Sequence, residues 1–189
     1  MSASAADVVL ACQPNREAGS FVFPYSVTNN GPADIYVFDA LPGIDPATRQ
    51  TRIDANSVTV SLAGDGFVHV LKGLPPPPTD RDVAVRLVPL AAKLPPGQTL
   101  KRTLRVPLPF AEINPYFPDL PLRQYEQVDI KGVIIVIEFL RSTLPGLAAA
   151  PDRFGATLFR VVSQDPFAEA QRVTQSFAAK GLTVLKRKG

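Results

Sequence analysis

The most informative pattern in the sequence is the stretch Gln127–Leu140, which reads QVDIKGVIIVIEFL. It begins by alternating, because Val128 and Ile130 point one way while the polar residues between them point the other. After Gly132 the alternation gives way to five β-branched residues, Val133–Ile137. β-Branched side chains fit a pleated surface better than a helix, so the stretch is predicted to be a strand. Since both faces of the run are apolar, each face needs a packed layer over it.

Alternation also predicts a strand at Ser20–Asn29, whose larger apolar residues share one face: Phe21, Phe23, Tyr25 and Val27. Pro24 has no N–H to donate, so the strand should be unpaired or bulged there. The turn sequence Asn29-Asn30-Gly31-Pro32 follows, and Ala33–Ala40 is predicted to return as the partner strand of a hairpin. Asp7–Cys12 is predicted to be a short edge strand.

A second hairpin is predicted for Ser57–Leu62 and Phe67–Lys72, because Gly64-Asp65-Gly66 lies between them. In the connection before it, Asp45-Pro46 is typical of the start of a single helical turn. The four successive prolines Pro75–Pro78 should be extended. Pro95-Pro96-Gly97 matches a type II turn. The remaining predicted strands are Asp82–Leu90, Gln98–Val106, Gly155–Ser163 and Leu182–Lys188.

One helix is predicted, near the end of the chain. Asp165 is a suitable N-cap, Pro166 fits the first helical position, and Lys180-Gly181 is a stop signal. Apolar residues recur between these signals at helical spacing: Phe167, Ala170, Val173 and Phe177. Such a stripe is usually a core face, so the helix is expected to cover the exposed side of Val133–Ile137.

The composition supports a mainly β fold. The chain has 189 residues and 20 prolines, and prolines at that density break helices and separate short strands. We therefore expect a single domain, 1–189, built as an antiparallel immunoglobulin-like β-sandwich with one C-terminal helix packed against it. Residues 164–189 form a helix–strand extension of that domain.

Two motifs carry a resemblance to known families. Val27-Thr28-Asn29-Asn30-Gly31 follows a predicted strand, and Leu94-Pro95-Pro96-Gly97-Gln98-Thr99 precedes one. Over roughly Ser20–Leu140, this arrangement resembles bacterial immunoglobulin-like modules, namely the adhesion-type CARDB domains and the intracellular proteinase inhibitors of the BsuPI kind. The resemblance implies a β-sandwich, and it implies a non-catalytic role more often than an enzymatic one.

Charge and cysteine content narrow the classes of partner. The net charge is +3, and the basic residues outside the tail Lys186-Arg187-Lys188 are scattered, so nucleic acid is not an expected partner. The single cysteine, Cys12, excludes an intramolecular disulfide and should be a buried thiol. The first residues lack the pattern of a signal peptide, and no apolar stretch is long enough to span a bilayer, so we expect a cytoplasmic protein.

The candidate chemistry is sparse. His69, the only histidine, lies in an alternating strand with no nucleophile motif nearby, so it is expected at the sheet surface rather than in a catalytic site. Glu138 lies between Ile137 and Phe139, and if it is buried it needs a partner, for which Arg141 and Arg160 are candidates. Its alternatives are a general acid and a gatekeeper against aggregation.

No metal site or cofactor is expected. Two pairs of aspartates, Asp80 with Asp82 and Asp45 with Asp54, offer oxygen ligands to calcium, but neither has the spacing of an EF-hand. No phosphate-binding or dinucleotide-binding motif accompanies Gly64-Asp65-Gly66. We therefore predict that the protein is not an enzyme, with a hydrolase as the least supported alternative.

The segment Pro107–Tyr125 is the candidate binding site. It is rich in proline and aromatic residues and too irregular for a strand or helix, and loops of that length are often functional. Its predicted binding residues are Phe110, Tyr116, Phe117 and Tyr125. The competing interpretation is that these rings fold back and cap one end of the sandwich.

Three functions are therefore compared. The first is a non-catalytic interaction module that binds a protein partner through this loop. The second is a self-assembling structural subunit. The third is a carrier of a small apolar ligand, built as a β-barrel with an internal cavity.

Overall fold

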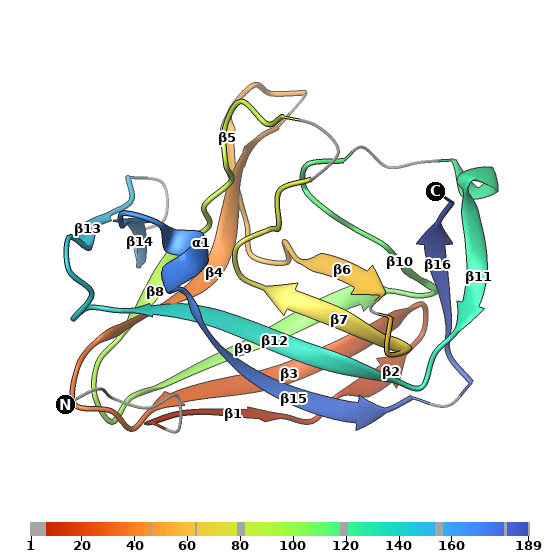
Figure 1. Cartoon of the computed structure of the whole chain (residues 1–189), viewed down its shortest axis with the longest axis horizontal. Coiled ribbons are helices and arrows are strands. Elements are labelled where there is room, and N and C mark those ends of the chain that lie inside the picture. The colour runs from red at the N-terminus through yellow and green to blue at the C-terminus, as the bar shows by residue number, and fades with distance from the viewer. Residues whose placement is uncertain are drawn as a thin grey trace.

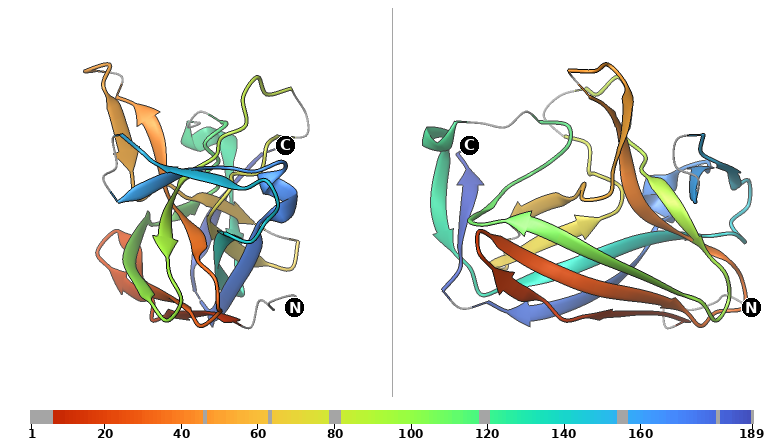
Figure 2. Two further views of the ribbon diagram at one scale, coloured as in Figure 1. Left: turned by 90° about the vertical axis from the view of Figure 1, so that its left-hand side faces the viewer. Right: turned by 180° about the vertical axis from the view of Figure 1, so that it is seen from behind.

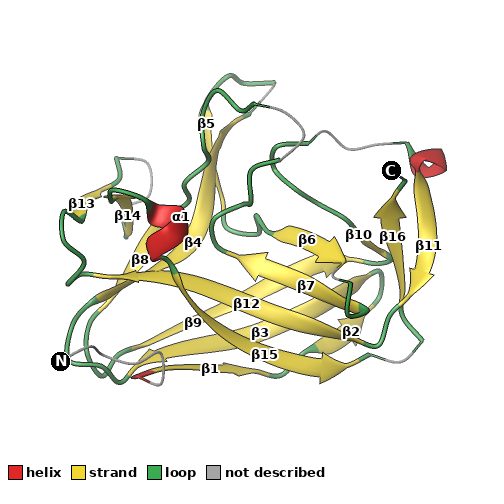
Figure 3. Cartoon of the chain, in the orientation of Figure 1, coloured by secondary structure: helices red, strands yellow, loops and turns green. Residues whose placement is uncertain are grey.

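The computed structural model describes residues 7–45, 47–62, 64–78, 82–117, 121–153, 157–179 and 181–188. Strands make up 57% of the structure and helices 4%, which confirms the predicted mainly β class (Figure 3). The strands form a nine-stranded sheet, a four-stranded sheet and a three-stranded sheet. Among the described strands no pairing joins the two ends of a sheet, so the sheets are open.

The nine-stranded sheet is built around β12 (Gly132–Arg141), which crosses the molecule between β7 and β15 (Figure 1). Its other strands are β4 (Ile35–Ile44), β5 (Thr51–Asp54), β6 (Thr59–Leu62), β7 (Phe67–Lys72), β8 (Leu90–Leu94), β13 (Ala148–Pro151), β14 (Leu158–Val162) and β15 (Gln171–Ala178). On one edge β12 pairs with β15 alone. On the other edge it pairs with β7 in parallel as far as Ile137, and then with β4 from Phe139. The change of partner falls at Glu138.

The four-stranded sheet has β3 (Ser20–Asn29) at its centre. Strand β9 (Thr99–Pro107) pairs along one edge, while β1 (Val8–Cys12) and β2 (Asn15–Glu17) share the other. The break between β1 and β2 lies opposite Pro24, which confirms the predicted interruption at this residue. In the three-stranded sheet, β16 (Thr183–Arg187) lies between β10 (Phe110–Ala111) and β11 (Tyr125–Asp129).

One large core joins the nine-stranded and four-stranded sheets. Seen from behind, β3 and β9 lie in front of β12 (Figure 2). The same core cluster contains Phe23 and Leu104 from the smaller sheet and Ile135 and Ile137 from β12. The opposite face of β12 packs in a second cluster through Leu140. The apolar run Val133–Ile137 is therefore covered on the face that enters the large core. On its other face Val136 is buried but Ile134 is only half-buried, so the predicted cover is partial there.

A single glutamine links the two sheets at one edge. Gln175 of β15 accepts the Cys12 N–H at 2.8 Å and donates to the Cys12 carbonyl at 3.2 Å. Its amide thus bonds like a peptide group of an adjoining strand. This contact covers part of an edge that would otherwise present unpaired backbone groups.

The predicted single strand Gln127–Leu140 is in fact two strands, β11 and β12. The chain turns at Ile130, which is buried, and at Lys131, whose N–H donates to the Gly66 carbonyl at 2.9 Å. The alternating half pairs with β16, whereas the unbroken apolar half enters the large sheet. The change in pattern at Gly132 marks this boundary.

The predicted hairpin across Asn29–Pro32 is wrong, because β3 and β4 belong to different sheets. The buried Asn29 holds the crossing with its side chain. Its Oδ1 accepts the Gly31 N–H at 3.0 Å, while its Nδ2 donates to the carbonyls of Ala33 and Leu94, both at 2.9 Å. The turn residues are as predicted, but they connect two layers instead of two paired strands.

The predicted C-terminal helix is also wrong beyond its first turn. Helix α1 spans Pro166–Glu169 only, and the Asp165 side chain caps it by accepting the Ala168 N–H at 3.3 Å. Residues 171–178 form β15, which pairs with β12 along its edge instead of covering its face. Val173 and Phe177 are four residues apart, a spacing that puts them on one side of a helix and equally on one face of a strand.

Other boundaries differ as well. Of the predicted strand Asp82–Leu90 only Leu90 is in a strand, where β8 begins. Two hairpins were not predicted, β4 with β5 and β13 with β14. At the first of them the Asp45 carboxylate accepts the N–H groups of Ala47 and Thr48, both at 2.9 Å, and the Arg49 N–H donates to the Asp45 carbonyl at 2.8 Å, as the predicted single helical turn requires. The predicted positions Pro46, Asp80, Gly155 and Lys180 lie outside the described residues.

Several local predictions are confirmed. Strand β3 has the predicted bounds, and β6 and β7 form the predicted hairpin. Gly97 has a positive φ of 73°, and the Gln98 N–H donates to the Pro95 carbonyl at 3.2 Å, as a type II turn requires. Strands β9 and β16 also lie where the alternation predicts them.

Candidate functional site

The four predicted binding residues do not form one exposed site. The Phe110 side chain is fully buried, with 0% of its surface exposed, and its ring packs 5.6 Å from that of Phe21. The expectation that Phe110 offers contact area to a partner is therefore wrong. The core takes this ring because β10 pairs with β16 and carries Phe110 inward.

Tyr116 braces the segment before β8. Its hydroxyl oxygen accepts the Leu87 N–H at 2.6 Å. Two residues earlier, the Asn114 side chain donates to the Pro76 carbonyl at 3.1 Å. This part of the Pro107–Tyr125 segment is thus bonded to the two stretches that wall the grooves described below.

Phe117 and Tyr125 each lie beside Arg187 of the C-terminal strand β16. The Arg187 guanidinium lies 5.1 Å above the Phe117 ring, and Tyr125 is the register partner of Arg187 between β11 and β16. The basic tail of the sequence is therefore engaged with its own chain: Lys186 lies 3.7 Å from Glu126, and Lys188 donates to the Arg123 carbonyl.

Glu138 is buried, with 1% of its surface exposed, and both carboxylate oxygens have a donor. Arg172 Nε donates to one at 2.8 Å, and the Leu74 N–H donates to the other at 2.7 Å. The predicted partners are wrong, because Arg141 bonds Gln171 and Arg160 pairs with Asp152. The partner of Glu138 is Arg172, which lies directly opposite it on β15. The sequence pattern did not predict this strand.

Gly73 makes room for this carboxylate. A Cβ at Gly73 would lie only 2.3 Å from Glu138 Oε2 and 2.7 Å from its Cβ. The chain can therefore leave β12 here only because residue 73 has no side chain. The Leu74 N–H that follows is then free of the strand ladder and bonds the carboxylate.

His69 and the described aspartates lie apart from one another. His69 is half-buried on β7, with its Nε2 3.8 Å from the Asp65 carboxylate. Asp45 and Asp54 bond the backbone of their own turns, and Asp80 lies outside the described residues. Within the described ranges, no three histidine, cysteine, aspartate or glutamate side chains are close enough to hold a metal ion.

The sequence did not predict a polar cluster between the sheets, formed by Asp39, Lys72 and Arg102. Arg102 of β9 binds the Asp39 carboxylate of β4 through Nε at 2.9 Å and Nη2 at 2.7 Å. Lys72 is 3% exposed and donates to the Ala55 and Ser57 carbonyls. Burial lowers the pKa of Lys72 to about 8, although the nearby Asp39 acts in the opposite direction.

Burial also raises the pKa values of two other titratable groups near this cluster, Cys12 and Tyr25. It raises the pKa of the Cys12 thiol to about 11, so the predicted buried thiol is confirmed and carries no thiolate near neutral pH. Burial is also the main cause that raises the pKa of Tyr25, with Asp39 adding to it. The cluster is structural in its contacts, since each charged group bonds its own chain.

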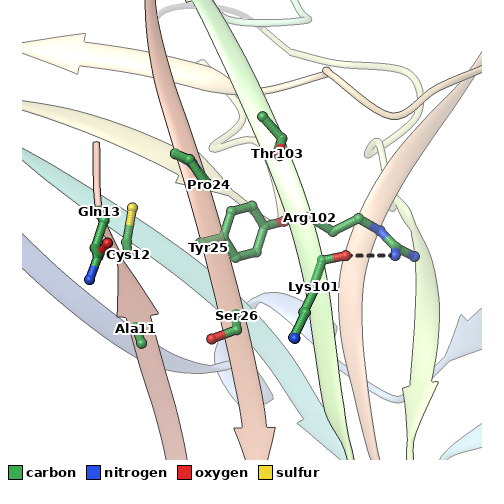
Figure 4. Close-up of a pocket in the computed structure, with 9 residues that line it drawn as sticks. All are labelled: Ala11, Cys12, Gln13, Pro24, Tyr25, Ser26, Lys101, Arg102 and Thr103. Carbon is green, nitrogen blue, oxygen red and sulfur yellow. Dashed lines mark hydrogen bonds between the residues drawn. The ribbon is translucent and has the colours of Figure 1, made fainter. Parts of the chain in front are cut away.

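The outer face of the four-stranded sheet carries a shallow depression of about 600 Å³ (Figure 4). Ser26 and Lys101 line it, and Arg102 folds back to donate to the Lys101 carbonyl at 3.0 Å. That contact occupies an acceptor on the outer edge of β9. The depression is wide and open, so it offers little enclosure to a ligand.

Two further grooves are each lined by a residue of α1. The first, which we call the valine groove, has a volume of about 430 Å³ and lies on the side of Pro166. Residues from three segments line it: Leu41, Val85, Arg86, Arg160, Val162 and Ser163. Val85 and Val162 are 72% and 59% exposed, and they are two of only four large apolar side chains so exposed in the described residues.

The second groove, the proline groove, has a volume of about 340 Å³ and lies on the side of Phe167. Strands β6, β7 and β12 supply its floor, including Ser61, Leu71 and Val136. Pro76, Pro77 and Phe167 form apolar walls, and Arg172 lies at the end where Glu138 is buried. Sequence reasoning missed both grooves because their residues come from distant segments.

Comparison with protein-family models, with curated protein sequences and with solved structures gives no match for this chain. In the part of the chain that the structure describes, no helix has the length and apolarity that a bilayer-spanning segment needs.

Proposed function

We propose that this protein is a non-catalytic interaction module of the immunoglobulin-like sandwich type, which holds an acidic and apolar segment of a partner protein in the valine groove. The observation that carries the proposal is the pair of exposed valines, Val85 and Val162, lining one concavity. Exposed apolar side chains that gather in one place usually mark an interaction site.

The charge of the groove supports an acidic partner. Arg86 and Arg160 line it, and no carboxylate is among its described lining residues. Arg86 is held with its guanidinium 5.3 Å above the Phe167 ring, while Arg160 binds Asp152 at 3.1 Å and remains 63% exposed. Two ordered guanidinium groups beside apolar side chains favour a segment that combines acidic and apolar residues.

The Pro107–Tyr125 segment contributes as a support in this proposal. Tyr116 bonds Leu87, in the middle of the stretch that carries Val85 and Arg86. A rigid wall loses less entropy on binding than a mobile one. The aromatic segment thus acts on recognition through the groove it braces.

Two observations support the immunoglobulin-like part. The core lies between two sheets, and the two motifs of the resemblance meet in space: the Gly97 N–H donates to the Asn29 carbonyl at 2.7 Å, and the Asn29 N–H donates to the Gln98 carbonyl at 3.0 Å. In a sandwich of this type, connections that cross between sheets are expected.

A displayed library of random short peptides, selected on the intact protein, tests the proposed function. Enriched peptides should combine acidic with apolar residues, and Val162→Asp should weaken their binding at least tenfold. Val9→Asp is the matched control, because Val9 is 46% exposed on the other sheet. Equal loss in both variants, or none in Val162→Asp, would overturn the proposal, and concentration-dependent sedimentation would favour self-assembly instead.

A further inference from the structure

The proline groove is lined by an arginine, Arg172, whose guanidinium is only partly hydrogen-bonded within the chain. Arg172 lies on β15 with 64% of its side chain exposed. Its Nε donates to Glu138, and among the described residues this is the one hydrogen bond of the guanidinium. The two terminal amino groups of the guanidinium are therefore available to an acceptor, while the Nε contact fixes their direction.

Glu138 does not compete for a ligand's donors. Both of its oxygens already accept, from Arg172 and from the Leu74 N–H, and the carboxylate is almost completely buried. Glu138 lines this end of the groove, but each of its oxygens already has a donor from the chain, and Arg172 supplies the donors that remain. An acceptor on a ligand can bond these N–H groups, and an anionic acceptor bonds them most strongly.

Beside the polar residues Thr59, Ser61 and His69, apolar side chains line the groove. Leu71 and Val136 lie on its floor, and Pro76 and Phe167 stand on either side. The Asn114 side chain holds Pro76 through its carbonyl, and Arg86 covers the Phe167 ring. Walls fixed in this way favour an apolar ligand body without a large ordering cost.

The size of the groove limits the ligand. Its volume of about 340 Å³ is near the lower end of the range of roughly 300–1,000 Å³ found for small-molecule pockets. We propose that the proline groove binds a small apolar monocarboxylate, with the carboxylate on Arg172 and the apolar body between Pro76 and Phe167. This site shares no lining residue with the valine groove.

Octanoate is the probe, and octan-1-ol, which has the same chain without the charge, is its control. Titrations of the intact protein followed by amide NMR should show octanoate binding at least tenfold more tightly than octan-1-ol. The shifted resonances should include residues 61, 71, 136 and 172. Equal binding of the two compounds, or shifts confined to the valine groove or the outer face of the other sheet, would overturn the proposal.

Charge substitutions at Ser61 test the site without disturbing the buried ion pair. Ser61 lines the groove and is exposed, so either substitution should leave the fold intact. Ser61→Asp should weaken octanoate binding by roughly three- to tenfold and Ser61→Lys should strengthen it, because the sign of the added charge is reversed. Unchanged affinity in both variants would contradict the site.

A conservative change at the arginine completes the test. Arg172→Lys keeps a positive charge for Glu138 but loses the planar guanidinium, so octanoate should bind several-fold more weakly while the melting temperature changes little. Arg105→Gln is the control, since Arg105 is an exposed arginine paired with Glu17 on the other sheet. A loss of binding in both variants would contradict a role for Arg172.

Discussion

Strands β12 and β15 lie side by side over eight residue pairs, but their side chains have very different surroundings. In β12 every residue except Ile134 is buried. In β15 only Val173 is buried, and every second residue is exposed. The first strand is held by packing on both faces, whereas the second is held mainly by its backbone ladder to the first.

The difference shows two ways in which a strand is stabilised. Each large apolar side chain buried in β12 contributes roughly 1.5–3 kcal/mol, so its conformation is strongly determined by packing. Strand β15 has few such contacts, and its neighbour supplies a row of N–H and C=O groups that need partners. Substitutions should therefore be costly in β12 and cheap in β15.

The largest effect is expected from Ile135→Asp. Ile135 is fully buried in the core between the two sheets, and an unpaired carboxylate there costs several kcal/mol, comparable to the stability of a whole domain. The variant should fail to fold cooperatively, as measured by circular dichroism and thermal melting. Ser176→Asp, on the exposed face of β15, should change the free energy of unfolding by less than about 0.5 kcal/mol. A soluble Ile135→Asp protein with a cooperative transition would refute the two-layer packing.

Truncation before Asp165 removes β15 and β16 together and leaves the edge of β12 without its partner. Because that edge is apolar and long, the shortened chain should aggregate, as measured by light scattering. A shorter truncation before Gly181 removes β16 but keeps β15, and it should aggregate less. If both shortened chains aggregate to the same extent, the uncovered edge of β12 is not the cause of the aggregation.

Gly132→Ala tests the point where the two strands first meet. A Cβ there would lie 2.4 Å from the Phe177 carbonyl oxygen of β15 and 2.6 Å from the Phe67 ring. A backbone carbonyl cannot move away by changing rotamer, as a side chain can. The variant should therefore lose about 2–3 kcal/mol in the free energy of unfolding, measured by denaturant titration. Gly43→Ala is the control, since its Cβ would meet nothing within 4 Å. Equal stabilities of the two variants would contradict the close packing at Gly132.

Lys72→Met probes the opposite edge of β12, where Lys72 is the register partner of Ile137. The pKa of Lys72 is lowered to about 8 from its ordinary 10.5. Below pH 8 Lys72 is charged in both the folded and the unfolded state. The cost of burying this charge therefore lowers the free energy of unfolding most in that range. Between about pH 8 and 10.5 the unfolded state binds more protons, so the free energy of unfolding should rise, by roughly 3 kcal/mol in total.

The methionine variant should lack this rise, which a series of denaturant titrations across the pH range measures. The pKa of Cys12, raised to about 11 from 9.0, acts in the opposite direction between those values, but it is present in both proteins and cancels in their difference. Lys101→Met is the control, because Lys101 is exposed. Identical pH slopes in wild type and Lys72→Met would show that the lysine is not held in a costly environment.

Local pattern determined much of this fold. The alternation of Ser20–Asn29, the glycines around Asp65 and the cap at Asp165 each depend on neighbours within a few residues, and each is present in the structure. The apolar run Val133–Ile137 predicted cover on both faces, and it is complete on the core face and partial on the other. These features follow from side-chain periodicity and backbone geometry, which a short window of sequence contains.

Tertiary structure decided which strands pair, and with that the candidate sites. A period of two or of 3.6 says which face of a segment is apolar, but not which edge of another strand it will join. Residues 171–178 became β15 because β12 offered an open edge, and Asn29 turned the chain into the other sheet instead of back on itself. These pairings also brought Arg172 to Glu138 and placed Phe167 in the wall of the proline groove. Contacts between residues far apart in sequence depend on the whole arrangement of strands, so no local pattern could reveal them.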